Sequence, residues 1–233
     1  INLTTQMLAT LFGFPFDERD KLTVWSDNFT SGVRRGDVEG AKAITAMMRE
    51  CLSYFQDLWH QRIAEPEDCF DLITPMQRDP ATSDMVARLM DYLGNMGLLI
   101  VGGNDTPRNS ITGGVLALNQ YPDKYDKLRA NPSLITRMVP EIIRWQTPLT
   151  HMRRTALEDV ELGGKTIRRG DKVAMWYISG NRDETVIEQA DDFIIDRVNP
   201  RHHVSFGFGI HRCMGNRLAE MQLRVLWEEI MNR

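Results

Sequence analysis

The sequence predicts a mainly α-helical fold with one small β region. Apolar residues recur at helical spacing through most of the chain, and the longest helical pattern covers about residues 84–118. The β-rich section is confined to about residues 149–179, where two short strand-like runs flank Gly163-Gly164. Residues 206–215 hold three glycines and one cysteine just before the last helical pattern. These features predict helices that support one glycine-rich loop with a reactive side chain.

The individual elements are predicted from spacing and from breaker residues. Asp17 is a candidate cap for the second helix, and Ser83 or Asp84 for the longest one. Residues 75–80 are expected to form a loop, and Pro140 to kink its helix or delay its start. The predicted helices cover about residues 2–12, 17–29, 38–64, 85–118, 123–129 and 133–145 and the stretch after Cys213, and the predicted strands cover 150–155, 160–162, 165–167 and 172–178.

Composition limits the classes of protein. The chain has 233 residues, a hydrophobic share of 42% and a formal net charge of −4. The hydrophobic share can supply a core, and the negative charge argues against a nucleic-acid partner, which prefers a basic face. Cys51, Cys69 and Cys213 are odd in number and widely spaced, which suits a reducing compartment. Apolar runs fall far short of the roughly 20 residues that span a membrane. We therefore expect a cytoplasmic protein without a membrane span.

Both ends of the chain lie inside helical patterns. The sequence starts at Ile1 and stops at Arg233 without a glycine or proline stop signal. We therefore expect residues 1–233 to form a single partial domain, truncated at both ends. The isolated fragment is expected to be inactive.

The glycine-rich loop is the first candidate site. Gly207 and Gly209 permit a tight turn because glycine adopts positive φ freely, and Gly215 lets backbone lie close to a flat ligand. Cys213 falls where the last helix is expected to begin, and free N–H groups and the positive helix end favour a thiolate there. Such a thiolate suits an iron ligand under a planar macrocycle.

Two other interpretations of Cys213 stay open at this point. A lone cysteine is often a small buried hydrophobe. A zinc site is the second alternative, because His202, His203 and His211 lie nearby, although structural zinc prefers paired ligand spacings that these residues do not make.

The loop resembles a known family motif. Phe206, Gly209, Cys213 and Gly215 match the haem-binding loop of the cytochrome P-450 superfamily, Phe-x-x-Gly-x-x-x-Cys-x-Gly. The resemblance covers essentially the whole chain and implies the C-terminal half, or somewhat more, of the cytochrome P-450 fold. It implies that Cys213 is the axial thiolate ligand of haem b (iron protoporphyrin IX), with Phe206, Gly209 and Gly215 shaping the cofactor site.

A second string lies inside the longest helical pattern. Residues 102–107 alone are typical of a turn that ends a helix. Alternatively a helix continues, Gly102 and Gly103 leave room for a bound gas, and the Thr106 hydroxyl returns to the Gly102 carbonyl. The string resembles the superfamily's oxygen-activation motif, which implies that Asp105 and Thr106 are the catalytic pair that delivers protons. Pro107 departs from that motif, because it removes the N–H that would bond Gly103.

A third motif is a pair of opposite charges. Glu141 and Arg144 are spaced i, i+3 on one helix face, which is often only a weak surface pair. They resemble the superfamily's Glu-x-x-Arg pair, and Arg197 matches the arginine that completes it. The resemblance implies a buried structural network in which every charge is paired.

Further resemblances concern the haem propionates and one structural string. Residues 151–159 resemble the family stretch whose arginine contacts a propionate, a role placed on Arg154, with Arg153 as the alternative. His211 matches a second propionate contact, and a cationic or N–H donor facing a carboxylate is physically reasonable in both cases. Residues 181–183, Asn-Arg-Asp, match a family string that is interpreted as structural.

The resemblance implies a monooxygenase that inserts one oxygen atom from O2 into an unactivated C–H bond. Residues 141–148 and 201–213 are similar to the soluble bacterial subfamily that hydroxylates alkanes and fatty acids at the terminal carbon. The alternatives are a hydroxylase of another small apolar substrate such as a terpenoid, and a haem-based gas sensor, which would lack the Asp105-Thr106 relay. An apolar substrate pocket is expected from Leu98, Leu99, Leu149 and Met152.

The electron supply is also implied by the resemblance. Electrons are expected from NADH through a reductase and a small acidic ferredoxin. A basic surface around the loop would steer such a partner, although an ordinary solvated face is the alternative. The arginines in question are Arg197, Arg201, Arg212, Arg217 and Arg224.

Overall fold

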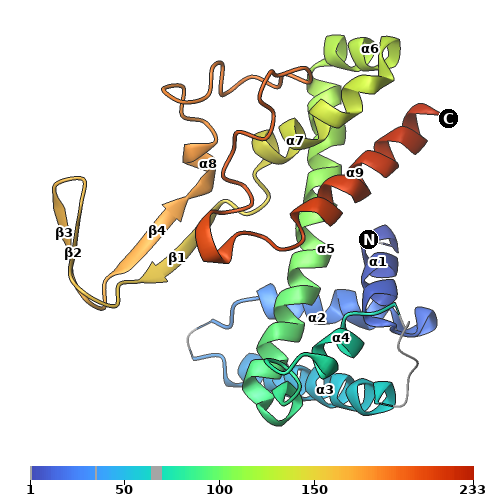
Figure 1. The fold of residues 1–233 in the computed structure, drawn as a ribbon, viewed down its shortest axis with the longest axis vertical. Helices are drawn as coiled ribbons and strands as arrows, with labels where there is room; N and C mark the ends of the chain where they lie inside the picture. The colour runs from blue at the N-terminus through green and yellow to red at the C-terminus, as the bar shows by residue number, and fades with distance from the viewer. Residues whose placement is uncertain (1, 35, 64–69) are drawn as a thin grey trace. The chain divides into compact units, whose positions relative to one another are not determined.

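The computed structural model describes residues 2–34, 36–63 and 70–233, which form two compact units, Ile1–Arg108 and Asn109–Arg233 (Figure 1). The prediction of a mainly helical chain with a small β region is confirmed. Ile1, the predicted helix end at Ala64, and Cys69 lie outside the described residues. No helix in the described ranges is long and apolar enough to cross a membrane.

The first unit is helical and has an aromatic core. Phe12, Trp25, Phe55 and Tyr92 are at most 1% exposed and come from four different helices. Phe12 and Phe55 meet edge to face at a centroid distance of 5.0 Å, so ring packing joins these helices. The helices are α1 (Asn2–Phe12), α2 (Asp20–Thr30), α3 (Val38–Arg62), α4 (Ile73–Arg78) and the first part of α5 (Leu89–Gln120).

Several helix starts differ from the predicted caps. Asp17 lies within the short 3-10 turn Phe16–Glu18 and does not cap α2. Asp84 precedes another 3-10 turn, Met85–Ala87, and its carboxylate accepts from Arg88 Nη2 at 3.0 Å instead of from a helix N–H. The longest helix therefore begins at Leu89 and not at residue 84 or 85. In each case a local side-chain or 3-10 arrangement replaced the expected cap.

The expected loop at residues 75–80 is partly helical. Asp71 Oδ1 accepts from Thr74 N at 2.7 Å, so a side chain just before α4 satisfies one of the first N–H groups of the helix. Pro75 then sits in the first turn, where a missing N–H costs nothing because that group has no partner within the helix. The helix continues to Arg78, so only the end of the predicted loop is irregular.

The second unit packs helices around two adjacent glycines of α5. A Cβ at Gly114 would lie 2.8 Å from both Ile142 Cδ1 of α7 and Trp227 Cζ2 of α9, so only glycine lets these helices approach so closely. Pro140 is buried inside α7, which starts before it, so of the two expected effects, a kink or a late start, the late start is wrong. The helices are the last part of α5, α6 (Pro122–Ala130), α7 (Ile135–Gln146), the short α8 (Tyr177–Gly180) and α9 (Asn216–Met231).

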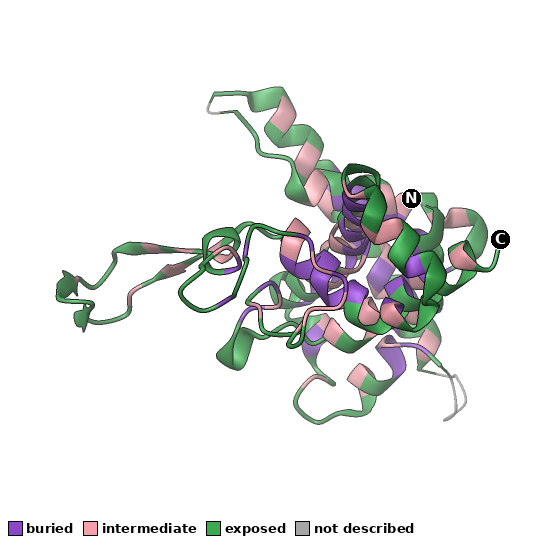
Figure 2. Cartoon of the chain, turned by 90° about the horizontal axis from the view of Figure 1, so that it is seen from above, coloured by how far each residue is buried: buried purple, intermediate pink, exposed green. Residues whose placement is uncertain are grey.

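The β region consists of two antiparallel pairs, of which the sequence predicted the hairpin but not the pairing of the outer two strands. Strand β1 (His151–Thr155) pairs with β4 (Lys172–Trp176), and β2 (Val160–Leu162) pairs with β3 (Lys165–Ile167) (Figure 1). Gly163 and Gly164 turn the hairpin with φ of 56° and 72°. The last strand ends at Trp176, two residues early, because α8 begins at Tyr177. The β2–β3 hairpin is almost wholly exposed (Figure 2).

Candidate functional site

The loop that carries Cys213 is shaped by two glycines and one backbone bond. Gly207 and Gly209 have φ of 68° and 72°, the left-handed conformation that favours glycine. The N–H of Cys213 donates to the carbonyl of Phe206 at 2.8 Å, which closes the loop. Helix α9 begins at Asn216. Cys213 therefore lies shortly before the helix and not at its first residue, so the helix end contributes less to the thiolate than expected.

The thiol of Cys213 is exposed, unlike that of a buried structural cysteine. Phe208, Ile210 and Met214 on the same loop are 87%, 96% and 84% exposed. Large apolar side chains beside a solvent-facing thiol form a surface that suits a flat, mostly apolar ligand. The sulfur donor and its apolar surroundings therefore fit a haem.

His203, one of the histidines near the loop, is partly buried and hydrogen-bonded. His203 Nδ1 accepts from Ser205 N at 3.2 Å, and its ring lies 5.6 Å from that of Phe206. Burial lowers the pKa of His203 to about 4, against the weaker opposing effect of Glu220, so the ring is neutral near pH 7. Across the ranges that the structure describes, no three side chains of His, Cys, Asp or Glu gather as a metal site.

Arg154 and His211 line one cavity of about 360 Å³ in the second unit. Alternation along β1 leaves Met152 and Arg154 half-buried, whereas Arg153 is exposed and does not line the cavity. A guanidinium and an imidazole in one cavity provide donors that suit a carboxylate. The cavity's other lining residues are Met175, Trp176, Tyr177, Val204, Gly207 and Phe208.

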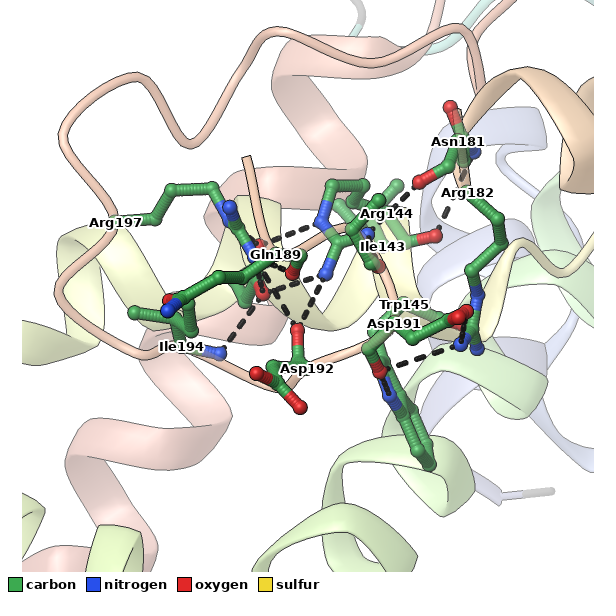
Figure 3. A network of polar contacts seen from close by, with 12 residues as sticks. Ile143, Arg144, Trp145, Asn181, Arg182, Gln189, Asp191, Asp192, Ile194 and Arg197 are labelled. Carbon is green, nitrogen blue, oxygen red and sulfur yellow. Dashed lines mark hydrogen bonds and ion pairs between the residues drawn. The ribbon is translucent and has the colours of Figure 1, made fainter. Parts of the chain in front are cut away.

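Glu141, Arg144 and Arg197 form a buried ion network (Figure 3). The side chains of Glu141 and Arg144 are 0% exposed, and Arg144 donates to both carboxylate oxygens of Glu141, at 2.8 and 2.7 Å. Arg197 Nε donates to Glu141 Oε2 at 2.9 Å, and Ile194 N donates to Oε1 at 2.9 Å. This burial is incompatible with a weak surface pair, and each charge has a partner, as a buried network requires.

The string at residues 102–107 is helical throughout, so α5 does not end there. Thr106 Oγ1 donates to the Gly102 carbonyl at 2.8 Å, as expected. Asp105 Oδ1 accepts from Arg108 Nη2 at 2.8 Å, a contact that was not predicted although i, i+3 spacing indicates it. Arg108 also lies 3.7 Å from Asp27 of α2. Asp105, the acid of the Asp105-Thr106 pair, is therefore held by the guanidinium of Arg108.

The two glycines before this pair have different surroundings. Apart from the adjacent backbone of its own helix, a Cβ at Gly102 would have no atom of the described residues within 4 Å, which fits the expected open space. A Cβ at Gly103 would lie 2.5 Å from Leu8 Cδ2 of α1. The expectation for Gly103 is thus corrected, since its missing side chain lets α1 pack against α5. Beside it, Thr4 Oγ1 donates to the buried Asn104 Oδ1 at 2.8 Å.

The residues expected to line a substrate pocket fall in both units. Leu98 is 70% exposed, whereas Leu99 packs against the core of the first unit. Leu149 is 39% exposed and Met152 is half-buried on β1, both in the second unit. Their common pocket stays a prediction.

The expected basic surface is weaker than the sequence indicated. Arg197 belongs to the buried network. Arg201 forms two-pronged hydrogen bonds with Glu220, the shortest of 2.7 Å, and Arg224 lies 3.5 Å from Glu228. Three of the five arginines are therefore paired with acids, which reduces the local positive charge.

Comparison with known proteins agrees with this geometry. A family model described as cytochrome P-450 matches residues 6–233. Linalool 8-monooxygenase from Pseudomonas putida is 42% identical over 229 residues, which cover 97% of this chain and 55% of that enzyme. Methyl-branched lipid omega-hydroxylase from Mycobacterium bovis is 44% identical over 135 residues, which cover 57% of this chain and 31% of that enzyme.

A solved structure shows the same fold. Cytochrome P-450-153 from Novosphingobium aromaticivorans matches with a TM-score of 0.90 and 48% identity over 100% of this chain and 56% of that one. The chain spans about half the length of the curated relatives it matches, 55% and 56% for two of them. The similarity extends over both units, and so includes the cysteine loop and the ion network.

Proposed function

The chain belongs to the cytochrome P-450 family, and on that premise we propose that it acts as a haem-thiolate monooxygenase with Cys213 as the iron ligand. The observation that supports this most is the exposed Cys213 thiol on a glycine-turned loop closed by its N–H bond to Phe206. Haem b would supply the activation of O2 and the insertion of one oxygen atom into an unactivated C–H bond.

The second unit would hold the cofactor. Cys213 supplies the thiolate, and Phe206, Gly209 and Gly215 shape the loop around it. Arg154 and His211 share a cavity in which both can donate to propionate oxygens. The protein's contribution on this side is to fix the sulfur and orient the macrocycle.

The first unit would supply protons. The Thr106 hydroxyl donates to the Gly102 carbonyl at 2.8 Å, and a hydroxyl group can both donate and accept hydrogen bonds, which suits the relay of a proton. Asp105 lies next to it and can exchange protons with solvent when its pair with Arg108 opens. Gly102, which has open space at its Cβ position, leaves room for a small gas.

We propose terminal hydroxylation of alkanes or fatty acids as the reaction. The 48% identity to cytochrome P-450-153 and the similarity to a lipid omega-hydroxylase support this substrate class. Another small apolar substrate, such as a terpenoid, is the second candidate, because the first relative named above acts on linalool. The proposed apolar lining consists of Leu98, Leu99, Leu149 and Met152. The proposed electron source is a small acidic ferredoxin with its NADH-dependent reductase. The proposed location is the cytoplasm.

The test uses the full-length protein. Purified with haem, reduced and exposed to carbon monoxide, it should show the long-wavelength Soret band of a thiolate adduct. It is then supplied with NADH, reductase, ferredoxin and either an n-alkane, a fatty acid or linalool, and the products are identified by mass spectrometry. Terminal alcohols support the proposed substrate class, and hydroxylated linalool alone supports the second. Absence of the band, or carbon monoxide binding without any alcohol, contradicts the monooxygenase proposal.

A further inference from the structure

We propose that Asn181 is a positioning residue for the Cys213 thiolate, because it ties the turn that enters the cysteine loop to the end of α7. The inference rests on the proposed function, in which Cys213 binds iron. Asn181 belongs to the Asn-Arg-Asp string that the sequence alone presents as merely structural. Its side chain contacts the backbone that leads to the cysteine and acts on the thiolate only through that backbone.

Asn181 is fully buried, and both the oxygen and the nitrogen of its side-chain amide form hydrogen bonds. Oδ1 accepts from Val204 N at 2.8 Å. Nδ2 donates to Ser205 Oγ and to Thr147 Oγ1, both at 2.8 Å. The amide orientation is determined, because a backbone N–H can only donate and must face the oxygen. Loss of this side chain would remove one hydrogen-bond partner from the buried hydroxyls of Thr147 and Ser205 and from the partly buried N–H of Val204.

The turn that Asn181 holds is linked by backbone bonds to the cysteine. Gly207 N donates to Val204 O at 2.8 Å and closes residues 204–207. Phe206, inside that turn, accepts from the N–H of Cys213 at 2.8 Å. The Ser205 hydroxyl also donates to Ile143 O of α7 at 2.9 Å. A displacement of the turn therefore moves the acceptor that fixes the backbone of Cys213.

On its other side Asn181 joins the buried ion network. Arg144 Nη1 donates to the Asn181 carbonyl at 2.9 Å, while the same guanidinium binds Glu141 (Figure 3). Asn181 thus lies between the charged network and the cysteine loop. Asn181 therefore connects the ion network, which otherwise has only a folding role, to the loop that carries the proposed iron ligand.

Thr147 is an independent sign that this junction is constrained. Its φ of 43° is left-handed, which is unusual for a β-branched residue. Thr147 Oγ1 donates to Arg144 O at 2.6 Å and accepts from Asn181 Nδ2. Such a conformation persists where surrounding contacts over-determine it. Here those contacts place the Thr147 hydroxyl where the Asn181 amide needs an acceptor.

The test compares Asn181→Ala and Ser205→Ala in the full-length haem protein. Outer-shell changes around a metal ligand typically cost on the order of 10–100-fold in metal affinity. We expect roughly tenfold faster transfer of haem to apomyoglobin, a smaller share of the thiolate–carbon monoxide band, and a shifted electron paramagnetic resonance spectrum of the ferric haem. Ser205→Ala keeps the Val204 contact and remains informative if Asn181→Ala does not fold.

Leu128→Ala is the control. Leu128 is 0% exposed in the core of the same unit and distant in sequence from the loop, so this variant lowers the melting temperature without touching the Asn181 contacts. Spectral change in Asn181→Ala and Ser205→Ala, with the Leu128→Ala spectra unchanged, supports the proposal. Unchanged spectra in both loop variants overturn it, as does an equal change in all three. A wild-type protein without a thiolate band overturns the proposed function itself and is thus a separate outcome.

Discussion

Arg197 Nε lies 2.9 Å from Glu141 Oε2, across 56 residues of sequence, and the carboxylate that it meets is fully buried. Arg144 occupies both oxygens of the same carboxylate. One buried negative charge thus serves two arginines, and the segment around Arg197 is anchored to α7 by it. Removal of that charge leaves two cations in a region with little water.

Glu141→Gln should therefore destabilise the protein strongly. Breaking a buried ion pair by removing one partner costs about 3–5 kcal/mol, because the remaining charge is left uncompensated. Urea unfolding followed by circular dichroism measures this loss. The control is Glu39→Gln, which breaks the pair with Lys42, two side chains that are 84% and 68% exposed, and should cost about 1 kcal/mol or less. Similar losses in the two variants would contradict the structural role of the network.

Cys213→Ala should abolish the thiolate–carbon monoxide band, since the variant has no sulfur at the proposed ligand position. The control is Cys51→Ala. Cys51 is 0% exposed in the first unit, and burial raises the pKa of its thiol to about 12, so it is neutral and has a structural role. We expect Cys51→Ala to keep the band. A long-wavelength band that survives in Cys213→Ala would show that another group ligates iron.

Arg154 and Arg153 are adjacent but face differently, which makes them a matched pair. Arg154→Leu should weaken haem retention about tenfold or more, since a hydrogen bond to a charged group contributes roughly 1.5–3 kcal/mol. Arg153→Leu, an exposed change outside the cavity, should leave retention near that of the natural protein. Haem transfer to apomyoglobin measures both rates. The reverse ranking would place the propionate contact on Arg153.

Pro107→Thr should improve the coupling of oxygen use to product. Proline removes the N–H that would bond Gly103 and crowds its carbonyl, at a cost on the order of 3 kcal/mol in an ordinary helix interior. Thr106 keeps its bond to Gly102 next to this defect, and a misplacement by about 1 Å can cost roughly a hundredfold in rate. NADH consumed, peroxide released and alcohol formed are compared, and we expect less peroxide per alcohol in the variant.

The control for that experiment is Pro122→Ala. Pro122 opens α6, where the lost N–H has no helical partner in any case, so coupling should not change. Equal or poorer coupling in Pro107→Thr would mean that the proline is required by the geometry of the site.

The partly buried His203 should make the stability of the protein depend on pH. Burial lowers its pKa to about 4, so the unfolded chain binds a proton near pH 6 that the folded chain does not. This histidine's contribution to stability therefore falls as pH drops from about 6.5 toward 4, by about 2 kcal/mol between pH 7 and 5. Urea unfolding at several pH values should show a flatter dependence for His203→Gln. His202 is an exposed neighbour, so His202→Gln should keep the pH dependence of the natural protein. A flatter pH dependence in His202→Gln would contradict the assignment of the effect to His203.

Local pattern was sufficient for some features and insufficient for others. The β2–β3 hairpin and the Thr106 bond to Gly102 follow from residues a few positions apart, and both were predicted. The role of Gly103 depends on Leu8, and the contacts of Asn181 depend on Ser205 and Val204, which only the folded chain brings close. Caps failed for a different reason, since Asp84 had a competing partner in Arg88.

The exposed hairpin has a practical consequence for attaching probes. Apart from the adjacent residues of the chain, no atom of the described residues lies within 4 Å of a Cβ at Gly163 or Gly164, so the tip has open space around it. Both glycines have positive φ, however, so a labelled cysteine is better placed at the neighbouring Lys165 of β3. A fluorophore there, or a covalently tethered electron donor, would leave the packed helices undisturbed. The hairpin is thus a suitable attachment site for immobilising the protein on an electrode.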